Sequence, residues 1–323
     1  MRKTEIFIDP GHSNWILGGL VREVSEIDPV FFFKPTAISN IRSKFIFSTI
    51  FKVIRVLMRR NPILFSSLTP LENFLKIAKL SINKKAVMFT HHEGELTKKD
   101  LKILHRVDLI FVFSSNDKSR LENLGIIRSI VVLTGAINPE LFSSPARPGN
   151  KIVYIGTAVE RKNPKCFLDF AELNPNIEFR ILGKDWKKST LWKELDKFSN
   201  IEYSEITGPI TSKELDFCSH YLMLSRVEGG PMTLIESVAA GLIPISTKTG
   251  IAPDFLLQVG YFDQLIEIPP SFDQIKSKLE NKYSKNQVES ASVIAKEYSL
   301  ERLSQVIKSE IYANLIDFES SKL

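Results

Sequence analysis

The sequence is poor in cysteine and has no apolar run long enough to span a membrane as a helix. Cys166 and Cys218 are the only cysteines in the 323 residues, too few for a disulfide framework or a zinc site, which fits a reducing cytosol. The amino-terminal stretch MRKTEIFIDPGH has an apolar core that is too short for a signal peptide. A spanning helix needs about 20 apolar residues, so we expect a cytoplasmic protein without a membrane-spanning segment.

Motifs for nucleic acid and for metal are also missing. The formal net charge of +6 is compatible with nucleic acid, an anionic membrane or an anionic substrate. No zinc-finger, RNA-binding or helix-turn-helix pattern occurs, so we expect no nucleic-acid partner. No Asp-x-Asp pair follows an expected strand, and the pair His91 and His92 lacks a third ligand. We therefore expect no metal site and no cofactor.

Acidic residues are absent between Pro29 and Leu71, where the chain is basic instead. Within residues 40–62, apolar side chains recur at helical spacing on one face and basic side chains fall on another. Such a basic amphipathic helix is typical of binding to an anionic membrane surface. The alternative is a helix that packs its apolar face into a domain core. The basic residues are Arg42, Lys44, Lys52, Arg55, Arg59 and Arg60, and the apolar ones are Phe47, Ile50, Phe51, Ile54 and Met58.

The chain alternates short apolar runs with helix-like stretches, which predicts an α/β fold. Its length favours two domains, and residues 143–150, with two prolines and a glycine, form the expected linker. The strands expected in the first domain cover 5–9, 30–33, 85–90, 107–114 and 130–134. Those in the second cover 151–156, 179–182, 222–224 and a run that begins at residue 243.

Residues 225–246, SRVEGGPMTLIESVAAGLIPIS, have the pattern of a strand end, a glycine-rich loop, a helix and a strand. The helix is expected over 233–240, and Gly241 stands where a C-terminal cap belongs. Such a loop lies at the carboxyl end of a strand, where free N–H groups at the helix start favour an anion. Glu228 and Glu236 flank this position, and the hydroxyls of a ribose or hexose would give both carboxylates hydrogen-bond partners. The alternative is a loop carboxylate and an ordinary glutamate on a helix surface.

The run EGGPMTLIESVAAGLIPI resembles the Glu-x7-Glu signature of retaining glycosyltransferases of family 4. That family has the GT-B architecture, in which two Rossmann-like doubly wound domains face a central cleft. The resemblance implies that Glu236 holds the ribose hydroxyls of a nucleotide sugar and that Glu228 lies near its sugar. The backbone that follows Glu228 would approach sugar and phosphate at Gly229, Gly230, Pro231, Met232 and Thr233.

The resemblance extends to positions outside this run. The family often places an arginine directly after the glycine that ends the first strand of the second domain, and a lysine a few residues later, both on the donor diphosphate. Thr157 stands at the arginine position here, Lys162 matches the lysine, and Arg161 supplies further positive charge. The resemblance places Gly11 near the phosphates, His92 near the transferred sugar and Gly183 near the base. His92, Glu228 and Lys162 are then the expected catalytic residues.

The resemblance implies a metal-independent transferase that moves a hexose-type sugar from a nucleotide-diphosphate sugar to a glycan or lipid-linked acceptor, in bacterial surface polysaccharide synthesis. Residues 1–147 would form the acceptor-side domain and 148–302 the nucleotide-sugar domain, with a C-terminal helix over about 303–323 that crosses back. Segment 40–62 would make the protein peripheral on the inner face of the cytoplasmic membrane. Two alternatives stay open: a sugar-nucleotide epimerase of the same fold, and an inactive partner of a transferase, for which Thr157 is the argument.

Overall fold

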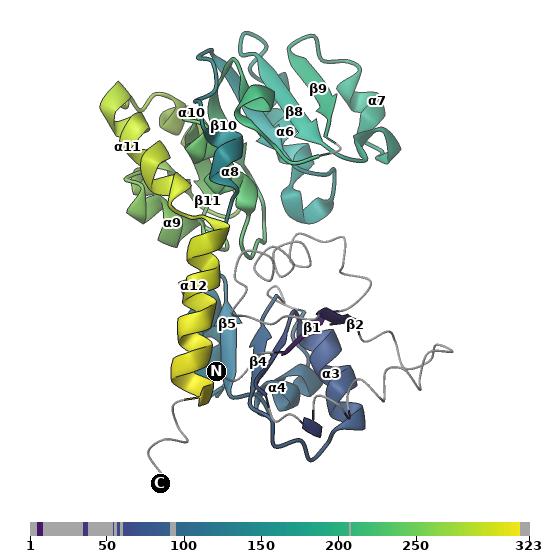
Figure 1. Ribbon diagram of the computed structural model, residues 1–323. Helices are drawn as coiled ribbons and strands as arrows, with labels where there is room; N and C mark the ends of the chain where they lie inside the picture. The colour runs from purple at the N-terminus through teal and green to yellow at the C-terminus, as the bar shows by residue number, and fades with distance from the viewer. Residues whose placement is uncertain are drawn as a thin grey trace. The chain divides into compact units, whose positions relative to one another are not determined.

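The computed structural model describes residues 5–8, 35–37, 54, 57–58, 61–90, 95–206 and 208–316, and describes 5–8, 35–37 and 316 by their backbone. The expected strand over 30–33, the candidate residues Gly11 and His92, and most of segment 40–62 lie outside the described residues. The chain divides into two compact units (Figure 1). The first unit comprises residues 1–134 and 300–323, and the second comprises residues 135–299.

The first unit contains a parallel sheet with the strand order β2-β1-β3-β4-β5-β6. The runs expected over 5–9, 85–90, 107–114 and 130–134 overlap β1, β4, β5 and β6. The sequence pattern does not predict β3, because three apolar residues are too few to show a period. The strands are β1 (Glu5–Ile8), β2 (Pro35–Ala37), β3 (Ile63–Phe65), β4 (Lys85–Met88), β5 (Leu109–Val112) and β6 (Ser129–Val132).

The helices that follow these strands are α3 (Leu68–Ile77), α4 (Lys98–Leu104) and α5 (Ser115–Asn123). Strand β5 is buried on both faces: Ile110 and Val112 join a cluster with residues of α3, while Leu109 and Phe111 are buried on the opposite face. This explains the continuous apolar run in the sequence, because parallel strands are usually covered on both sides.

The last described part of the chain belongs to the first unit. Helix α12 (Leu300–Ile311) continues as a π-helix over Tyr312–Ile316. Ser129 in β6 donates a hydrogen bond to Asn314 Oδ1 at 2.9 Å, which joins this helix end to the first sheet. One face of the helix is buried, and the residues on it recur every four positions: Leu303, Ile307, Ile311 and Leu315.

The second unit contains a parallel sheet with the strand order β12-β11-β10-β7-β8-β9. This is the doubly wound order of dinucleotide-binding sheets, and its direction of winding reverses between β7 and β10. Ligands of such sheets bind at the carboxyl ends of the strands beside this switch point. The strands are β7 (Lys151–Ile155), β8 (Phe179–Gly183), β9 (Ile201–Glu205), β10 (Cys218–Met223), β11 (Ile243–Thr247) and β12 (Leu265–Ile266).

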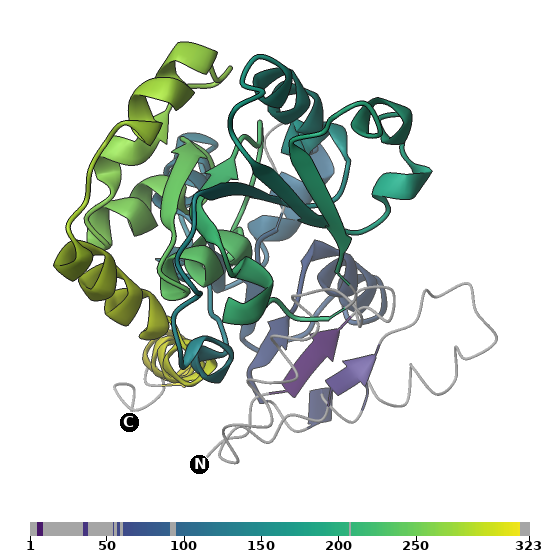
Figure 2. The same cartoon turned by 90° about the horizontal axis from the view of Figure 1, so that it is seen from above.

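Helices cover both faces of this sheet, and the side chains of β7 alternate between them. Val153 and Ile155 pack with α8, α9 and α11, whereas Ile152 and Tyr154 pack with α6 and α10. Figure 2 shows α11 on the flank of the unit. The helices are α6 (Pro164–Glu172), α7 (Trp192–Leu195), α8 (Met232–Ala239), α9 (Ala252–Gln258), α10 (Phe272–Leu279) and α11 (Lys285–Lys296), with 3-10 turns over 139–142, 160–162, 186–188, 212–215 and 262–264.

The boundaries between the units lie after Thr134 and after Ser299, earlier than the expected positions 147 and 302. The reason is that the supposed linker packs on the second unit. Phe142, the residue before this linker, is fully buried in the core of that unit. Arg147 Nε donates to Asp216 Oδ2 at 2.7 Å, and its guanidinium carbon lies 4.6 Å from the centre of the Phe217 ring. A composition of prolines and polar residues predicts a linker but does not reveal such contacts.

Candidate functional site

Two loops meet at the carboxyl ends of β7 and β10, beside the switch point of the second sheet. One loop contains the 3-10 turn Glu160–Lys162, and the other leads from β10 into α8. The backbone N–H of Arg226 donates to the carbonyl of Arg161 at 2.8 Å. The side chain of Arg226 reaches back to Glu160, with Nη1 at 3.1 Å from Oε1. The backbone bond joins the two loops, and the exposed ion pair lies beside it.

Glu228 lies at the centre of this junction and is held by two cations. Lys162 Nζ is 2.5 Å from Oε1 of Glu228, and Arg161 Nη1 is 3.0 Å from Oε2. The Glu228 side chain is 6% exposed and that of Lys162 is 14% exposed, whereas Arg161 is 45% exposed. Glu228, Lys162 and Arg161, three residues that the resemblance assigns to the donor, therefore lie in direct contact.

Two hydroxyl residues that the sequence reasoning missed hold Glu228 in position. Ser225 Oγ donates to Glu228 Oε1 at 2.8 Å, and the backbone N–H of Glu228 donates to Thr249 Oγ1 at 2.9 Å. Thr249 precedes Gly250, which has φ of +55°, and a Cβ at Gly250 would come within 2.2 Å of the Gly229 carbonyl oxygen. Only glycine fits this close approach. The Thr249-Gly250 pair after β11 is the sequence feature that could have indicated this contact with the Glu228 loop.

Glu236 stands in a different environment, one turn into α8. Its carboxylate has no hydrogen-bond partner among the described residues, and burial raises its pKa to about 7. The nearby Tyr221 is fully buried in β10, and burial followed by the charges of Glu228 and Glu236 raises the pKa of its hydroxyl. Both carboxylates thus lie within electrostatic reach of one buried tyrosine. A half-buried carboxylate without a hydrogen-bond donor is costly, and sugar hydroxyls would supply such donors.

The start of α8 offers backbone N–H groups rather than side chains. Its N-cap is Pro231, which provides no side-chain cap, and the first turn contains no acidic residue. The Met232 sulfur accepts a bond from the N–H of Ala136 at 3.3 Å, and the Thr233 hydroxyl is 2.9 Å from the Tyr221 hydroxyl. Met232 and Thr233 therefore use their side chains in packing. The N–H of Leu234 donates to the Pro231 carbonyl at 3.1 Å, and the positive dipole end of the helix favours an anion.

Gly183 has a packing role at the end of β8. A Cβ there would lie 2.0 Å from the Gly156 carbonyl oxygen, which also accepts a 2.8 Å bond from the Trp186 indole N–H. Gly156 in turn lies under the stem of Lys162, whose Cδ would be 3.6 Å from an added Cβ. These two glycines let β7, β8 and the lysine come together.

Metal binding finds no support in the described part of the chain, where no group of three or more His, Cys, Asp or Glu residues could hold an ion. Over the same residues, no helix is long and apolar enough to cross a membrane.

One edge of the second sheet brings together both carboxylates of the Glu-x7-Glu run, both expected cations and the glycine-rich loop.

Residues 140–299 match the protein-family model described as "Glycosyl transferases group 1". The match covers nearly half of the chain and lies within the second unit, where it includes the loop, both carboxylates and both cations. No curated protein matches the sequence.

Solved structures match nearly the whole chain. Sucrose-phosphate synthase from Thermosynechococcus elongatus is 13% identical, with 99% of this chain and 100% of that chain covered, and a TM-score of 0.69. The apo form of the lipopolysaccharide outer core galactosyltransferase WaaB is 15% identical, with coverage of 97% and 100% and a TM-score of 0.74. The pneumococcal O-GlcNAc transferase GtfA, in complex with UDP and GlcNAc, is 18% identical, with coverage of 80% and 57% and a TM-score of 0.59. These similarities show the fold: the chain has the GT-B fold that the sequence predicts.

Proposed function

We propose that this chain is a retaining glycosyltransferase that moves a hexose-type sugar from a nucleotide-diphosphate sugar to a glycan or lipid-linked acceptor, in bacterial surface polysaccharide synthesis. The observation that carries the proposal is the cluster of Lys162, Arg161 and Glu228 beside the start of α8, with Glu236 one turn along, whose carboxylate has no partner among the described residues. The family-model match over the same residues supports it.

Each group has a role in the proposed reaction. The bond between the sugar C1 and the phosphate oxygen breaks, and a bond from C1 to the acceptor oxygen forms on the same face. The departing phosphate takes the acceptor's proton, so no side-chain base is required. Lys162, Arg161 and the first N–H groups of α8 neutralise the charge that grows on the phosphate. Glu236 accepts hydrogen bonds from the ribose, and Glu228 with His92 positions the hexose.

A calorimetric screen of nucleoside diphosphates and nucleotide sugars against the purified chain tests the donor site. We expect one base to bind best, and an NMR spectrum of the transfer product to show the same anomeric configuration as the donor. Absence of binding by every nucleotide would contradict the proposal. A product formed without any acceptor would favour the epimerase alternative, and binding without turnover would favour an inactive partner, the reading that Thr157 supports.

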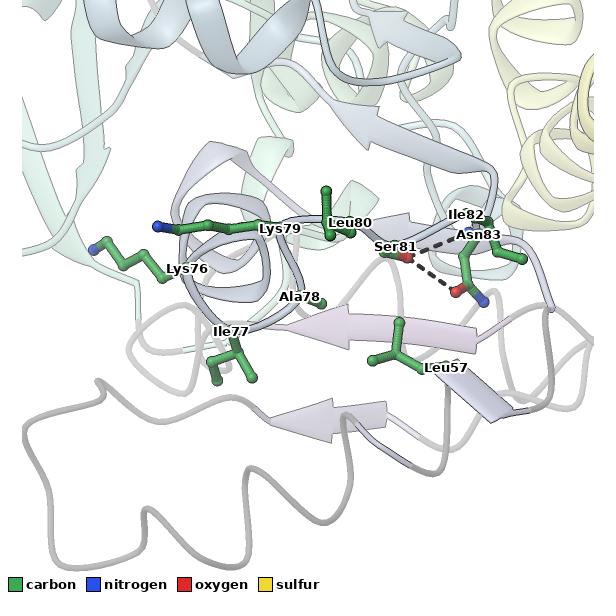
Figure 3. Close-up of a pocket in the computed structure, with 9 residues that line it drawn as sticks. All are labelled: Leu57, Lys76, Ile77, Ala78, Lys79, Leu80, Ser81, Ile82 and Asn83. Atoms are coloured by element: carbon green, nitrogen blue, oxygen red, sulfur yellow. Dashed lines mark hydrogen bonds between the residues drawn. The ribbon is translucent and has the colours of Figure 1, made fainter.

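We also propose that the protein binds an anionic membrane surface, and exposed apolar side chains in the first unit support this. In segment 40–62, Ile54 is 47% exposed and Met58 is 80% exposed, so neither is buried in a core. The loop before β4 adds Leu80, 94% exposed, and Ile82, 70% exposed. Figure 3 shows Leu57 and this loop around one cavity of about 500 Å³, with the side chains of Lys76 and Lys79 on one side of it.

These residues lie on one edge of the first sheet, because the loops that precede parallel strands gather at the same edge. The loop before β6 contributes Ile127, 89% exposed, to that edge. Cations accompany them: Arg106 donates to the Lys79 carbonyl, and Arg128 donates to the His105 carbonyl at 2.7 Å. Exposed apolar tips among lysine and arginine suit an anionic lipid interface.

Sedimentation with anionic and neutral liposomes tests the membrane proposal. We expect binding to anionic vesicles only, and loss of most of it in the double variant Leu80→Ser with Ile82→Ser, since each inserted leucine or isoleucine contributes ~1.5–3 kcal/mol. The matched control, Leu257→Ser with Val293→Ser, changes residues that are 64% and 61% exposed in the second unit and should bind as wild type. Equal binding by both double variants would contradict the proposed surface.

A further inference from the structure

Both cations that the proposed function gives to the donor diphosphate are already paired in the structure. Lys162 and Arg161 contact opposite oxygens of the Glu228 carboxylate, at 2.5 and 3.0 Å. A diphosphate that contacts Lys162 would therefore meet the negative charge of Glu228 next to it. Like charges this close repel strongly in a site with little solvent to screen them, and Glu228 is only 6% exposed.

The backbone of Glu228 is held in place by hydrogen bonds, which keeps its side chain beside the two cations. Its N–H is bound by Thr249, and the following Gly229 carbonyl accepts a 2.9 Å bond from the N–H of Ile251. Ser225 holds one carboxylate oxygen from the other side, at 2.8 Å. The carboxylate can turn within the site, but its charge stays there. If phosphates take its cations, Glu228 needs new hydrogen-bond donors in the same place.

We propose that Glu228 competes with the diphosphate for Lys162 and Arg161, and that the hydroxyls of the bound sugar compensate Glu228 when it yields them. This inference rests on the proposed donor site and adds a specificity role to it. A nucleotide sugar supplies both the phosphates and the hydroxyls, so the exchange is balanced. A nucleoside diphosphate without sugar leaves the carboxylate uncompensated. Glu228 then favours binding of the nucleotide sugar over the nucleoside diphosphate product. Its ion pairs with Lys162 and Arg161 form again as the product leaves.

Inorganic pyrophosphate is the suitable probe, because it presents the phosphates without sugar, ribose or base. The variant Glu228→Gln removes the competing charge and keeps an oxygen for the Ser225 hydroxyl. We expect calorimetry to show pyrophosphate binding at least fivefold more tightly to Glu228→Gln than to wild type. The best nucleotide sugar should gain less than pyrophosphate does, because the variant also loses the carboxylate that receives the sugar hydroxyls.

Glu160→Gln is the matched control. Glu160 carries the same charge in the facing loop and pairs with Arg226 at 3.1 Å, but its side chain is 89% exposed. Glu160→Gln should change the affinity for pyrophosphate less than twofold, because solvent screens an exposed ion pair. An equal gain in both variants would mean that net charge alone explains the effect, and would overturn the proposal.

The outcomes separate this inference from the donor site itself. Equal pyrophosphate affinity in wild type and Glu228→Gln would overturn the competition and leave the donor site standing. A nucleotide sugar that binds equally well to wild type, Lys162→Ala and Arg161→Ala would overturn the donor site. If Glu228→Gln does not fold, a structure of the wild-type chain with pyrophosphate decides. The inference requires the Lys162 Nζ to Glu228 Oε1 distance to open beyond the ion-pair limit of ~4 Å, and an unchanged contact would overturn it.

Discussion

Glu228 and Glu236 are the same residue type at the same edge of one sheet, yet their surroundings are opposite. Glu228, in the loop, is surrounded by donors: two cations, a serine hydroxyl and a fixed backbone. The carboxylate of Glu236, on α8, has no partner among the described residues, and burial raises its pKa to about 7. Within the described residues the Glu228 carboxylate is paired, and the proposed ribose would supply the hydrogen-bond donors that the Glu236 carboxylate lacks.

This difference explains how one site accommodates two nearby carboxylates. Two charged carboxylates around one buried tyrosine would repel each other and oppose an anionic ligand. Ion pairs balance the charge of Glu228, whereas burial raises the pKa of Glu236. The donor must then change both, through its phosphates at one acid and its hydroxyls at the other.

The largest expected effect comes from the cations that pair with Glu228. Lys162→Ala should lower turnover by roughly 10²- to 10³-fold, because the phosphate charge that it meets grows in the transition state. Arg161→Ala should cost less, since that side chain is 45% exposed against 14% for Lys162. Steady-state kinetics checks the order. The reverse order would make Arg161 the principal group, and full activity in both variants would place the diphosphate elsewhere.

Glu236→Ala tests the uncompensated acid. It removes an acceptor of two charged hydrogen bonds from ribose hydroxyls, each worth about 1.5–3 kcal/mol, so the nucleotide sugar should bind more than tenfold more weakly. Pyrophosphate has no ribose and should bind as it does to wild type, which provides an internal control. Unchanged nucleotide affinity in calorimetry would remove Glu236 from the ribose site.

The smallest expected effect is on stability and concerns pH. The pKa of Glu236 is about 7 in the folded chain against an ordinary 4.5, so the folded state binds the proton more tightly than the unfolded state. Wild-type stability should therefore fall as pH rises from 4.5 to 7 through this group. Glu236→Gln lacks that loss and should be more stable at pH 8 by up to ~3 kcal/mol, with the two chains nearly equal at pH 4.5. Urea unfolding at both pH values measures the difference in stability between the two chains. An equal difference at both pH values would contradict its attribution to the raised pKa of Glu236.

The sequence alone determined the fold class and most of the second unit's site. Long apolar runs with glycine breaks predict parallel strands such as β7, β8 and β11, because buried parallel strands need such runs. The run EGGPMTLIESVAAG identifies the loop and helix because a glycine-rich turn, an uncapped helix start and Gly241, at φ of +90°, serve local backbone geometry. Local backbone geometry depends on residues that are adjacent in the sequence, so a single sequence is enough to predict it.

Tertiary structure decided what depends on residues far apart in the chain. The ion pairs of Glu228 join residues more than sixty positions apart, and its bond to Thr249 spans another turn. The boundary after Thr134 reflects the burial of Phe142 in the core of the second unit and the hydrogen bond from Arg147 to Asp216. The Met232 sulfur accepts a hydrogen bond from Ala136, and Gly183 allows the close approach of Gly156. No pattern in a single sequence reports such partners, because the energy of a contact depends on which surfaces the fold brings together.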